Sequence, residues 1–157
     1  MKLNLEMLLE QMEGDWISQK TLYYLKKKYI YNNKSNIKIL KLNNFTNNII
    51  KNSSNYNIYN FQYSNKKNND LYFFSKKSNY SSGNIKKISS NDIQNYHFQL
   101  ISSNCLIIQT MEKNIKYIEY IYYINKNFRI SITLLKKINQ YIAIAFTSYI
   151  RIIQANT

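Results

Sequence analysis

Residues 115–153 read, in order, IKYIEYIYYI, NKN, FRISITLLKKI, NQ and YIAIAFTSYIRII. Isoleucine, tyrosine and other β-branched or aromatic residues dominate the three long runs, and such residues favour strands. The two Asn-containing breaks suit turns, because asparagine tolerates a positive φ where glycine is absent. This stretch therefore predicts a meander of three long antiparallel strands at 115–124, 128–138 and 141–153.

The same strand-like rhythm extends back through the chain to Trp16. Short aromatic and β-branched runs alternate there with clusters of Asn, Ser and Lys, which is typical of many antiparallel strands. Seven further strands are expected near 16–25, 36–42, 56–63, 70–76, 84–88, 95–101 and 104–112. Residues 43–60 are the hardest to assign, and 45–51 fit either a helical turn or a frayed loop.

The N-terminal residues follow a helical pattern instead. Leucine and methionine alternate with glutamate, which predicts a helix over about 3–13 that stops at Gly14. Ten strands and one helix in 157 residues, with no linker-like segment, indicate a single all-β domain, 1–157, with its barrel over about 16–153. We expect an antiparallel up-and-down barrel of the lipocalin or fatty-acid-binding-protein kind, with an N-terminal helix.

The chain is strongly basic, with 22 Lys and Arg against 8 Asp and Glu and a net charge of +14. Only Arg129 and Arg151 are arginines, and the lysines are scattered in twos and threes. This bias, with abundant Asn, Ile and Tyr and no Pro, is what an A+T-rich genome encodes. We therefore prefer a solvated lysine coat to a nucleic-acid stripe and expect no nucleic-acid partner, whereas an acidic protein partner stays compatible.

The chain has only one cysteine and one histidine, and this excludes several classes of site. Cys105 is the only cysteine, which excludes an internal disulfide, and His97 is the only histidine, so no Cys/His metal site is expected. Cys105 is interpreted as a buried structural residue and His97 as an ordinary strand residue. No apolar run reaches the roughly 20 residues of a membrane helix, and residues 1–15 lack the features of a targeting peptide.

Four motifs carry a family resemblance. Gly14-Asp15-Trp16-Ile17-Ser18-Gln19-Lys20-Thr21 resembles Gly-x-Trp-x-Ser-Gln-Arg-Thr of the S-type phycobiliprotein chromophore lyases (CpcS/CpeS). Residues 127–131, 134–137 and 146–151 resemble their Asn-Leu-Arg-x-Arg, Val-Leu-Lys-Arg and Phe-x-Ser-Glu-Ile-Arg. Glu119, ten residues before Arg129, matches a family glutamate. The resemblance covers both ends of the chain, about half of it, and departs from the family pattern at Lys20, Ser131 and Tyr149.

The resemblance implies a lipocalin-like barrel that binds an open-chain tetrapyrrole, a bilin such as phycocyanobilin or phycoerythrobilin. The bilin is the transferred substrate, and it is attached through a thioether to a cysteine of a phycobiliprotein subunit. The resemblance leaves both a homodimer and a heterodimer open. Together with the A+T-rich composition, it points to the stroma of a plastid, the chloroplast, with the gene in the organelle.

The chemistry of a bilin selects the candidate site residues. Its two propionates need cations, for which Arg129 and Lys20 are candidates. Its pyrrole N–H groups need an acceptor such as the carboxylate of Glu119. Three tyrosines on expected strands are candidates to stack on the flat chromophore: Tyr63, Tyr122 and Tyr123. The alternatives are that Glu119 and Arg129 are surface charges and that the tyrosines pack the core. No catalytic residue is assigned, because the expected mechanism is positioning.

Arg151 has a structural interpretation instead. In lipocalins and their relatives a late arginine packs across the tryptophan that opens the first strand, so Arg151 is expected to lie over Trp16 and close the base of the barrel. A cation over an aromatic face contributes about 0.5 to 2 kcal/mol.

Strand parity decides whether Glu119 and Arg129 share a site. Side chains alternate along a strand, so the two face the same side only if paired positions in the hairpin sum to an even number. A three-residue turn at 125–127, with 124 opposite 128, meets that condition. We therefore expect this turn if the two residues form one pocket.

Two other functions stay open. A non-catalytic lipocalin-like carrier of a bilin or another apolar ligand would need the same barrel but no acceptor protein. A basic organellar RNA-binding protein would instead need clustered surface lysines and exposed aromatic rings.

Overall fold

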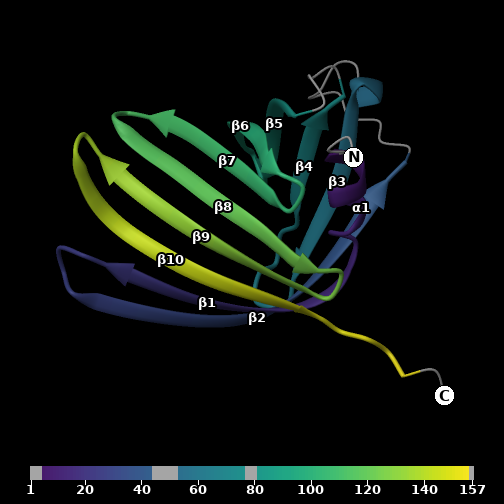
Figure 1. Ribbon diagram of the computed structural model, residues 1–157, viewed down its shortest axis with the longest axis horizontal. Helices are drawn as coiled ribbons and strands as arrows, with labels where there is room; N and C mark the ends of the chain where they lie inside the picture. Colours follow the sequence, from purple (N-terminus) through teal and green to yellow (C-terminus); the bar gives the residue numbers. More distant parts are fainter. Residues whose placement is uncertain (1–4, 44–52, 77–80, 156–157) are drawn as a thin grey trace.

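The computed structural model describes residues 5–43, 53–76 and 81–155 (Figure 1). It contains one helix, α1 (Leu5–Glu10), and one short 3-10 turn, η1 (Ser53–Asn55). The strands are β1 Gly14–Tyr24, β2 Tyr29–Leu42, β3 Tyr56–Tyr63, β4 Asp70–Ser75, β5 Ser82–Ser89, β6 Asp92–Ser102, β7 Cys105–Glu112, β8 Ile115–Asn125, β9 Phe128–Lys137 and β10 Gln140–Arg151.

The ten strands form a closed antiparallel barrel. Each strand pairs with its neighbours in chain order, and β10 returns to pair with β1, so that Trp16 lies opposite Arg151. The expectation of an up-and-down barrel of about ten strands behind one helix is confirmed. Closure leaves no unpaired sheet edge, and this lets a chain with so little Pro and Gly avoid edge-to-edge pairing.

Two expected boundaries were wrong. The strand expected at 36–42 begins at Tyr29, because the β1–β2 hairpin pairs as far as Tyr24 and Tyr29 and its polar residues bond across the strands, as in the hydrogen bond between Thr21 Oγ1 and Asn32 Oδ1. The helix expected over 3–13 is Leu5–Glu10, and the residues after it form a turn. Residues 3–4 and the expected helical turn or loop at 45–51 lie outside the described residues.

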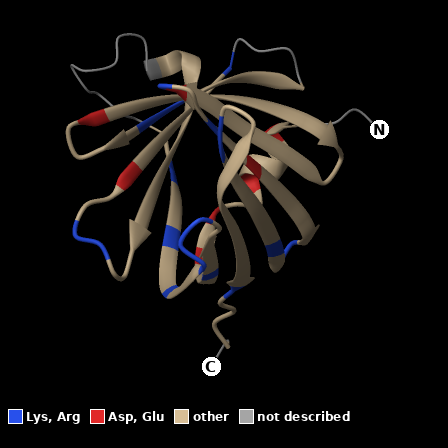
Figure 2. Ribbon diagram, turned by 90° about the vertical axis from the view of Figure 1, so that its left-hand side faces the viewer, with Lys and Arg blue, Asp and Glu red and all other residues tan. Residues whose placement is uncertain are grey.

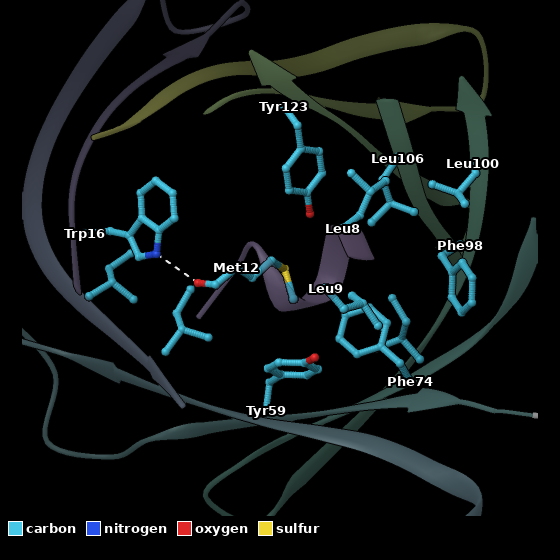
Figure 3. Packing of buried hydrophobic residues seen from close by; sticks show 13 residues of the cluster. Leu8, Leu9, Met12, Trp16, Tyr59, Phe74, Phe98, Leu100, Leu106 and Tyr123 are labelled. Carbon is cyan, nitrogen blue, oxygen red and sulfur yellow. Dashed lines mark hydrogen bonds between the residues drawn. The ribbon is translucent and has the colours of Figure 1, made fainter. Parts of the chain in front are cut away.

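Helix α1 fills one end of the barrel (Figure 3). Leu8, Leu9 and Met12 are buried, and they pack with inward side chains of the surrounding strands: Tyr59, Phe74, Phe98, Leu100, Leu106 and Tyr123. Each such large side chain contributes about 1.5 to 3 kcal/mol when fully buried. We call this end of the barrel the closed end.

The other end carries five of the connections between strands. Because consecutive strands run in opposite directions, the β1–β2, β3–β4, β5–β6, β7–β8 and β9–β10 turns all lie at the end away from α1. We call it the open end; three of its hairpins lie on the left of Figure 1. No helix among the described residues is long and apolar enough to cross a membrane.

Candidate binding site inside the barrel

A cavity lies between the closed-end core and the open end. Its inner part has a volume of about 120 Å³ and is lined mainly by aromatic and aliphatic side chains, with Glu119 and Arg129 as the two charged groups. An outer part of about 250 Å³ adjoins it and is lined mostly by polar side chains, including Lys20 and Tyr117. Both parts share Tyr63, Glu119 and Tyr149, among other residues.

Small inward side chains make this space. On β9, β10 and β1 the interior positions beside the cavity carry Ser131, Thr147 and Ser18, all buried. Large aromatic residues at the same interior positions of β3 and β4 fill the opposite wall, where Phe61 and Tyr72 lie with ring centroids 4.5 Å apart. The cavity thus has a polar, open wall facing an aromatic one.

Arg129 is a buried cation on the cavity wall, with 5% of its surface exposed. Its guanidinium carbon lies 4.6 Å from the ring centroid of Trp16 and 4.6 Å from that of Tyr149. Its Nη1 has no hydrogen-bond partner, and no ion pair joins it to any described residue. A buried donor without a partner is costly, so this nitrogen is prepared for an anionic or carbonyl ligand.

Glu119 is held through one of its two oxygens. Tyr117 donates its hydroxyl to Oε2 at 2.9 Å, and Thr133 donates to the same oxygen at 3.4 Å. Oε1 accepts no hydrogen bond from the described residues. Burial, and then the charge of Glu119, raises the pKa of Tyr117 far above its ordinary value, so this hydroxyl stays protonated and remains a donor.

The β8–β9 register places Glu119 and Arg129 on the same inner face. Glu119 pairs with Thr133 and Tyr123 pairs with Arg129, and the residue numbers of each pair sum to an even number. The expected three-residue turn at 125–127 is instead a two-residue turn at 126–127, and the register shifts between Tyr123 and Asn125. This irregularity has the same effect on parity as the longer turn.

Two other candidate residues also reach the cavity. Lys20 lines the outer part with an exposed side chain, and Tyr63 lies where the inner and outer parts join. Burial raises the pKa of Tyr63 well above its ordinary value, so this phenol is neutral. Lys20, Tyr63, Glu119 and Arg129 therefore line one continuous space.

The structure does not bring Tyr122 or Tyr123 to this space. Odd-numbered residues of β8 face inward, so Tyr122 faces outward, where it lies beside Cys105. Tyr123 faces inward but is packed among the core side chains near α1, and its hydroxyl has no hydrogen-bond partner (Figure 3). Burial raises the pKa of Tyr123 to about 12.

Sequence reasoning missed two tyrosines of the inner cavity wall, Tyr72 and Tyr149. Tyr149 pairs with Arg129 across β9 and β10 and stands where the family pattern has a glutamate, so register and motif together point to it. Tyr117 shares a face with Glu119 by strand alternation and could have been found in the same way. We see no sequence signal for Tyr72, which depends on barrel closure.

Arg151 lies over the same tryptophan as Arg129, with its guanidinium carbon 4.2 Å from the ring centroid of Trp16. It also donates to three backbone carbonyls: Nε to Lys126 at 2.9 Å, Nη2 to Gln11 at 2.7 Å, and Nη1 to Glu13. A side chain at Gly14 would overlap Nη1. Arg151 therefore joins the turn after α1, the β8–β9 turn and the start of β1.

The two remaining candidates for reactive chemistry lie elsewhere. Cys105 is buried on β7, and burial raises the pKa of its thiol. His97 is exposed on the outer face of β6. Among the described residues, no group of three or more His, Cys, Asp or Glu is placed to hold a metal ion.

Known proteins resemble this chain along nearly its whole length. A chromophore lyase CpcS/CpeS homolog of Gracilaria tenuistipitata var. liui is 35% identical over 147 residues, which are 92% of this chain and 95% of that protein. No family model matches the chain.

Solved structures share its fold. The S-type phycobiliprotein lyase CpeS from Guillardia theta superimposes with a TM-score of 0.71 at 11% identity, covering 98% of this chain and 96% of that one. A DUF3598-family protein of unknown function from Nostoc punctiforme gives a TM-score of 0.61 at 9% identity, covering 92% of this chain and 49% of that one. The barrel is thus that of an S-type lyase, and with a relative more than 30% identical along almost all of its length, the chain belongs to the CpcS/CpeS chromophore lyase family.

Proposed function

We propose that this protein binds a bilin in the barrel cavity and attaches it through a thioether to a cysteine of a phycobiliprotein subunit. The observation that carries the proposal is the buried Arg129, whose Nη1 is unpartnered on the wall of a cavity that also holds Glu119. Membership of the CpcS/CpeS family supports the same activity. Phycocyanobilin and phycoerythrobilin are the bilins to test first.

Each charged group of the cavity has a counterpart on a bilin. The Nη1 of Arg129 donates to one propionate, and Lys20 at the outer part reaches the other. The Oε1 of Glu119 accepts from pyrrole N–H groups, while Tyr117 and Thr133 hold Oε2. The aromatic wall opposite stacks on the pyrrole rings.

The volume of the cavity explains how the bilin is presented. Small-molecule pockets usually measure about 300 to 1,000 Å³, and the inner part alone, about 120 Å³, is smaller than that. A bilin therefore occupies the inner and outer parts together. One end of the chromophore then lies at the open end of the barrel, where an acceptor protein can reach it.

The chemistry needs positioning more than acid–base catalysis. The acceptor thiol adds across the ethylidene double bond of the bilin: a C–S bond forms at the exocyclic carbon, and the thiol proton ends on the neighbouring ring carbon, so no group leaves. Holding the bilin still lowers the entropic part of the barrier. Cys105 does not line the cavity and its pKa is raised, so the reacting thiol comes from the acceptor.

The test is a titration of the purified protein with phycocyanobilin and with phycoerythrobilin, followed by absorption. We expect a red-shifted, sharpened band with the wild type. Arg129→Met should weaken binding about a hundredfold, because a buried ion pair loses one partner. Since Nη1 of Arg129 has no hydrogen-bond partner in the free protein and methionine can still pack against Trp16 and Tyr149, the same change should alter the thermal midpoint little.

Lys76→Met, on an exposed lysine of the closed end, is the matched control and should bind the bilin like the wild type. Zinc-enhanced fluorescence of an apo-phycobiliprotein subunit on a denaturing gel then separates transfer from binding. No spectral change with any bilin would overturn the proposal, whereas binding without transfer would identify a carrier.

A further inference from the structure

We infer that the turns of the open end form a docking surface for a protein partner with an acidic surface. The inference rests on the proposed function, since the partner is then the phycobiliprotein subunit that presents the acceptor cysteine. Three independent features of these turns support it: their charge, their exposed aliphatic side chains and their backbone conformation.

Lysines surround the mouth of the cavity. Four of the five open-end turns carry or adjoin exposed lysines, and up-and-down topology brings them to the same end of the barrel: Lys26, Lys27, Lys28, Lys66, Lys67, Lys113 and Lys137. In Figure 2, which views the molecule from the left-hand side of Figure 1, blue segments lie on several turns. Glu10 and Glu13 lie at the closed end, and Asp92 and Glu112 are the exposed carboxylates that adjoin open-end turns, against seven lysines there. Seven lysines that look scattered in sequence thus lie around one opening.

Large aliphatic side chains are exposed beside these lysines. Ile138 is 74% exposed in the β9–β10 turn, and Met111 is 68% exposed at the end of β7. Ile30 and Ile93, each next to another open-end turn, are 57% and 47% exposed. An apolar contact area inside a charged rim is the usual composition of a protein–protein interface.

Backbone strain is concentrated in the same turns. Lys28, Ser90, Lys113, Asn114 and Ile138 are the described non-glycine residues with a positive φ, and all of them lie in open-end turns. Ile138 has φ 54°, which a β-branched residue adopts only at a cost. Asparagine is abundant in this A+T-rich composition and suits that conformation better, so base composition does not explain the isoleucine.

A protein partner fits these features better than a nucleic acid does. Nucleic acids reward lysines and aromatic rings, and Tyr29 and Tyr141 are exposed beside these turns, but exposed aliphatic side chains such as Ile138 add little to nucleic-acid binding and suit a protein partner. The lysines also encircle an opening instead of following one groove. Complementary charge would steer an acidic protein to the opening, and the aliphatic side chains would hold it there.

The experiment measures chromophore transfer to an apo-phycobiliprotein subunit, with bilin binding measured separately by absorption. Ile138→Asn should raise the thermal midpoint by about 3 °C, because it relieves the strain, and should leave bilin binding unchanged. It should lower kcat/KM for transfer about tenfold, because an interface anchor is lost. The double variant K26E/K27E should lower transfer by a similar factor, and high salt should reduce the difference from wild type.

Matched changes at the closed end are the controls. Ile153→Asn replaces an isoleucine that is 70% exposed, and K76E/K126E reverses two exposed lysines, so both should transfer like the wild type. Normal transfer by Ile138→Asn and K26E/K27E would overturn the inference and leave the proposed function intact. So would a loss of poly(U) RNA binding in K26E/K27E with transfer unchanged. Failure of the wild type to bind any bilin would overturn both.

Discussion

The single tryptophan of the chain has two arginines over its ring, and they differ in what else they bind. Arg129 has an unpartnered Nη1 on the cavity wall, whereas every nitrogen of the Arg151 guanidinium donates to a backbone carbonyl. Burial, and then the neighbouring Arg129, lowers the pKa of Arg151 from its ordinary value. The two arginines therefore share Trp16 as a neighbour but differ in role. Arg129 has a nitrogen free to bind a ligand, whereas the hydrogen bonds of Arg151 are all made within the fold.

Replacing Arg151 should mainly affect stability. Arg151→Met removes three charge-assisted hydrogen bonds and should cost about 3 kcal/mol of unfolding free energy, which lowers the thermal midpoint by roughly 10 °C. Gly14→Ala should act in the same direction, because a Cβ at Gly14 overlaps Nη1 of Arg151 and φ there is +126°. Circular dichroism melting curves measure both. A midpoint unchanged in Arg151→Met, with bilin binding lost, would mean that the two arginines have exchanged roles.

At the scale of elements, β4 begins with a buried carboxylate beside the aromatic wall of the cavity. Asp70 accepts hydrogen bonds from Lys66 Nζ and Ser89 Oγ, each at 2.6 Å, and its other oxygen lies 3.7 Å from Lys87 Nζ. The same lysines lie over the rings of Tyr63 and Tyr72. Burial alone would raise the pKa of Asp70, but the bonds from Lys66 and Ser89 and the charge of Lys87 lower it below its ordinary value.

The lowered pKa gives stability a defined pH dependence. Because the folded protein binds this proton less tightly than the unfolded chain, Asp70 contributes stability above its unfolded pKa, near 3.8, and loses it as pH falls through the folded value. Asp70→Asn should therefore cost about 2 kcal/mol at pH 7 and much less at acid pH, measured by urea unfolding. Asp92→Asn, on an exposed carboxylate, should cost little at either pH. An equal loss of unfolding free energy for Asp70→Asn at both pH values would contradict a lowered pKa of Asp70.

At the scale of the whole molecule, prediction succeeded for the barrel and its long apolar strands, and failed at the exposed end of β2 and at individual cavity residues. The meander at 115–153 was readable because its apolar runs are long and its turns carry asparagine. The shared Glu119–Arg129 face was expected only with a three-residue turn, and it arises instead from a register shift beside a two-residue turn. Residues 29–35 look like a loop because they extend β2 beyond the core, where most side chains are exposed and no alternation of buried and exposed positions marks a strand. Tyr122 was chosen as a candidate because it is a tyrosine, although strand alternation from Glu119 places it on the outer face. Tyr72 lines the site only because the barrel closes. In the sequence, the lysines are attributed to base composition. Only the up-and-down topology shows that several of them lie together at the open end.

The position of Trp16 makes its intrinsic fluorescence a probe of bilin binding. It is the only tryptophan among 16 tyrosines, it is 1% exposed, and it contacts Arg129, which lines the cavity. A bilin absorbs in the near ultraviolet, where indole emits, so a bound chromophore should quench this emission by energy transfer. Titration with a bilin should dim the tryptophan fluorescence of the wild type to a plateau, while Arg129→Met stays bright at the same concentrations. Steady emission during a titration in which absorption reports binding would mean that the chromophore lies far from the indole.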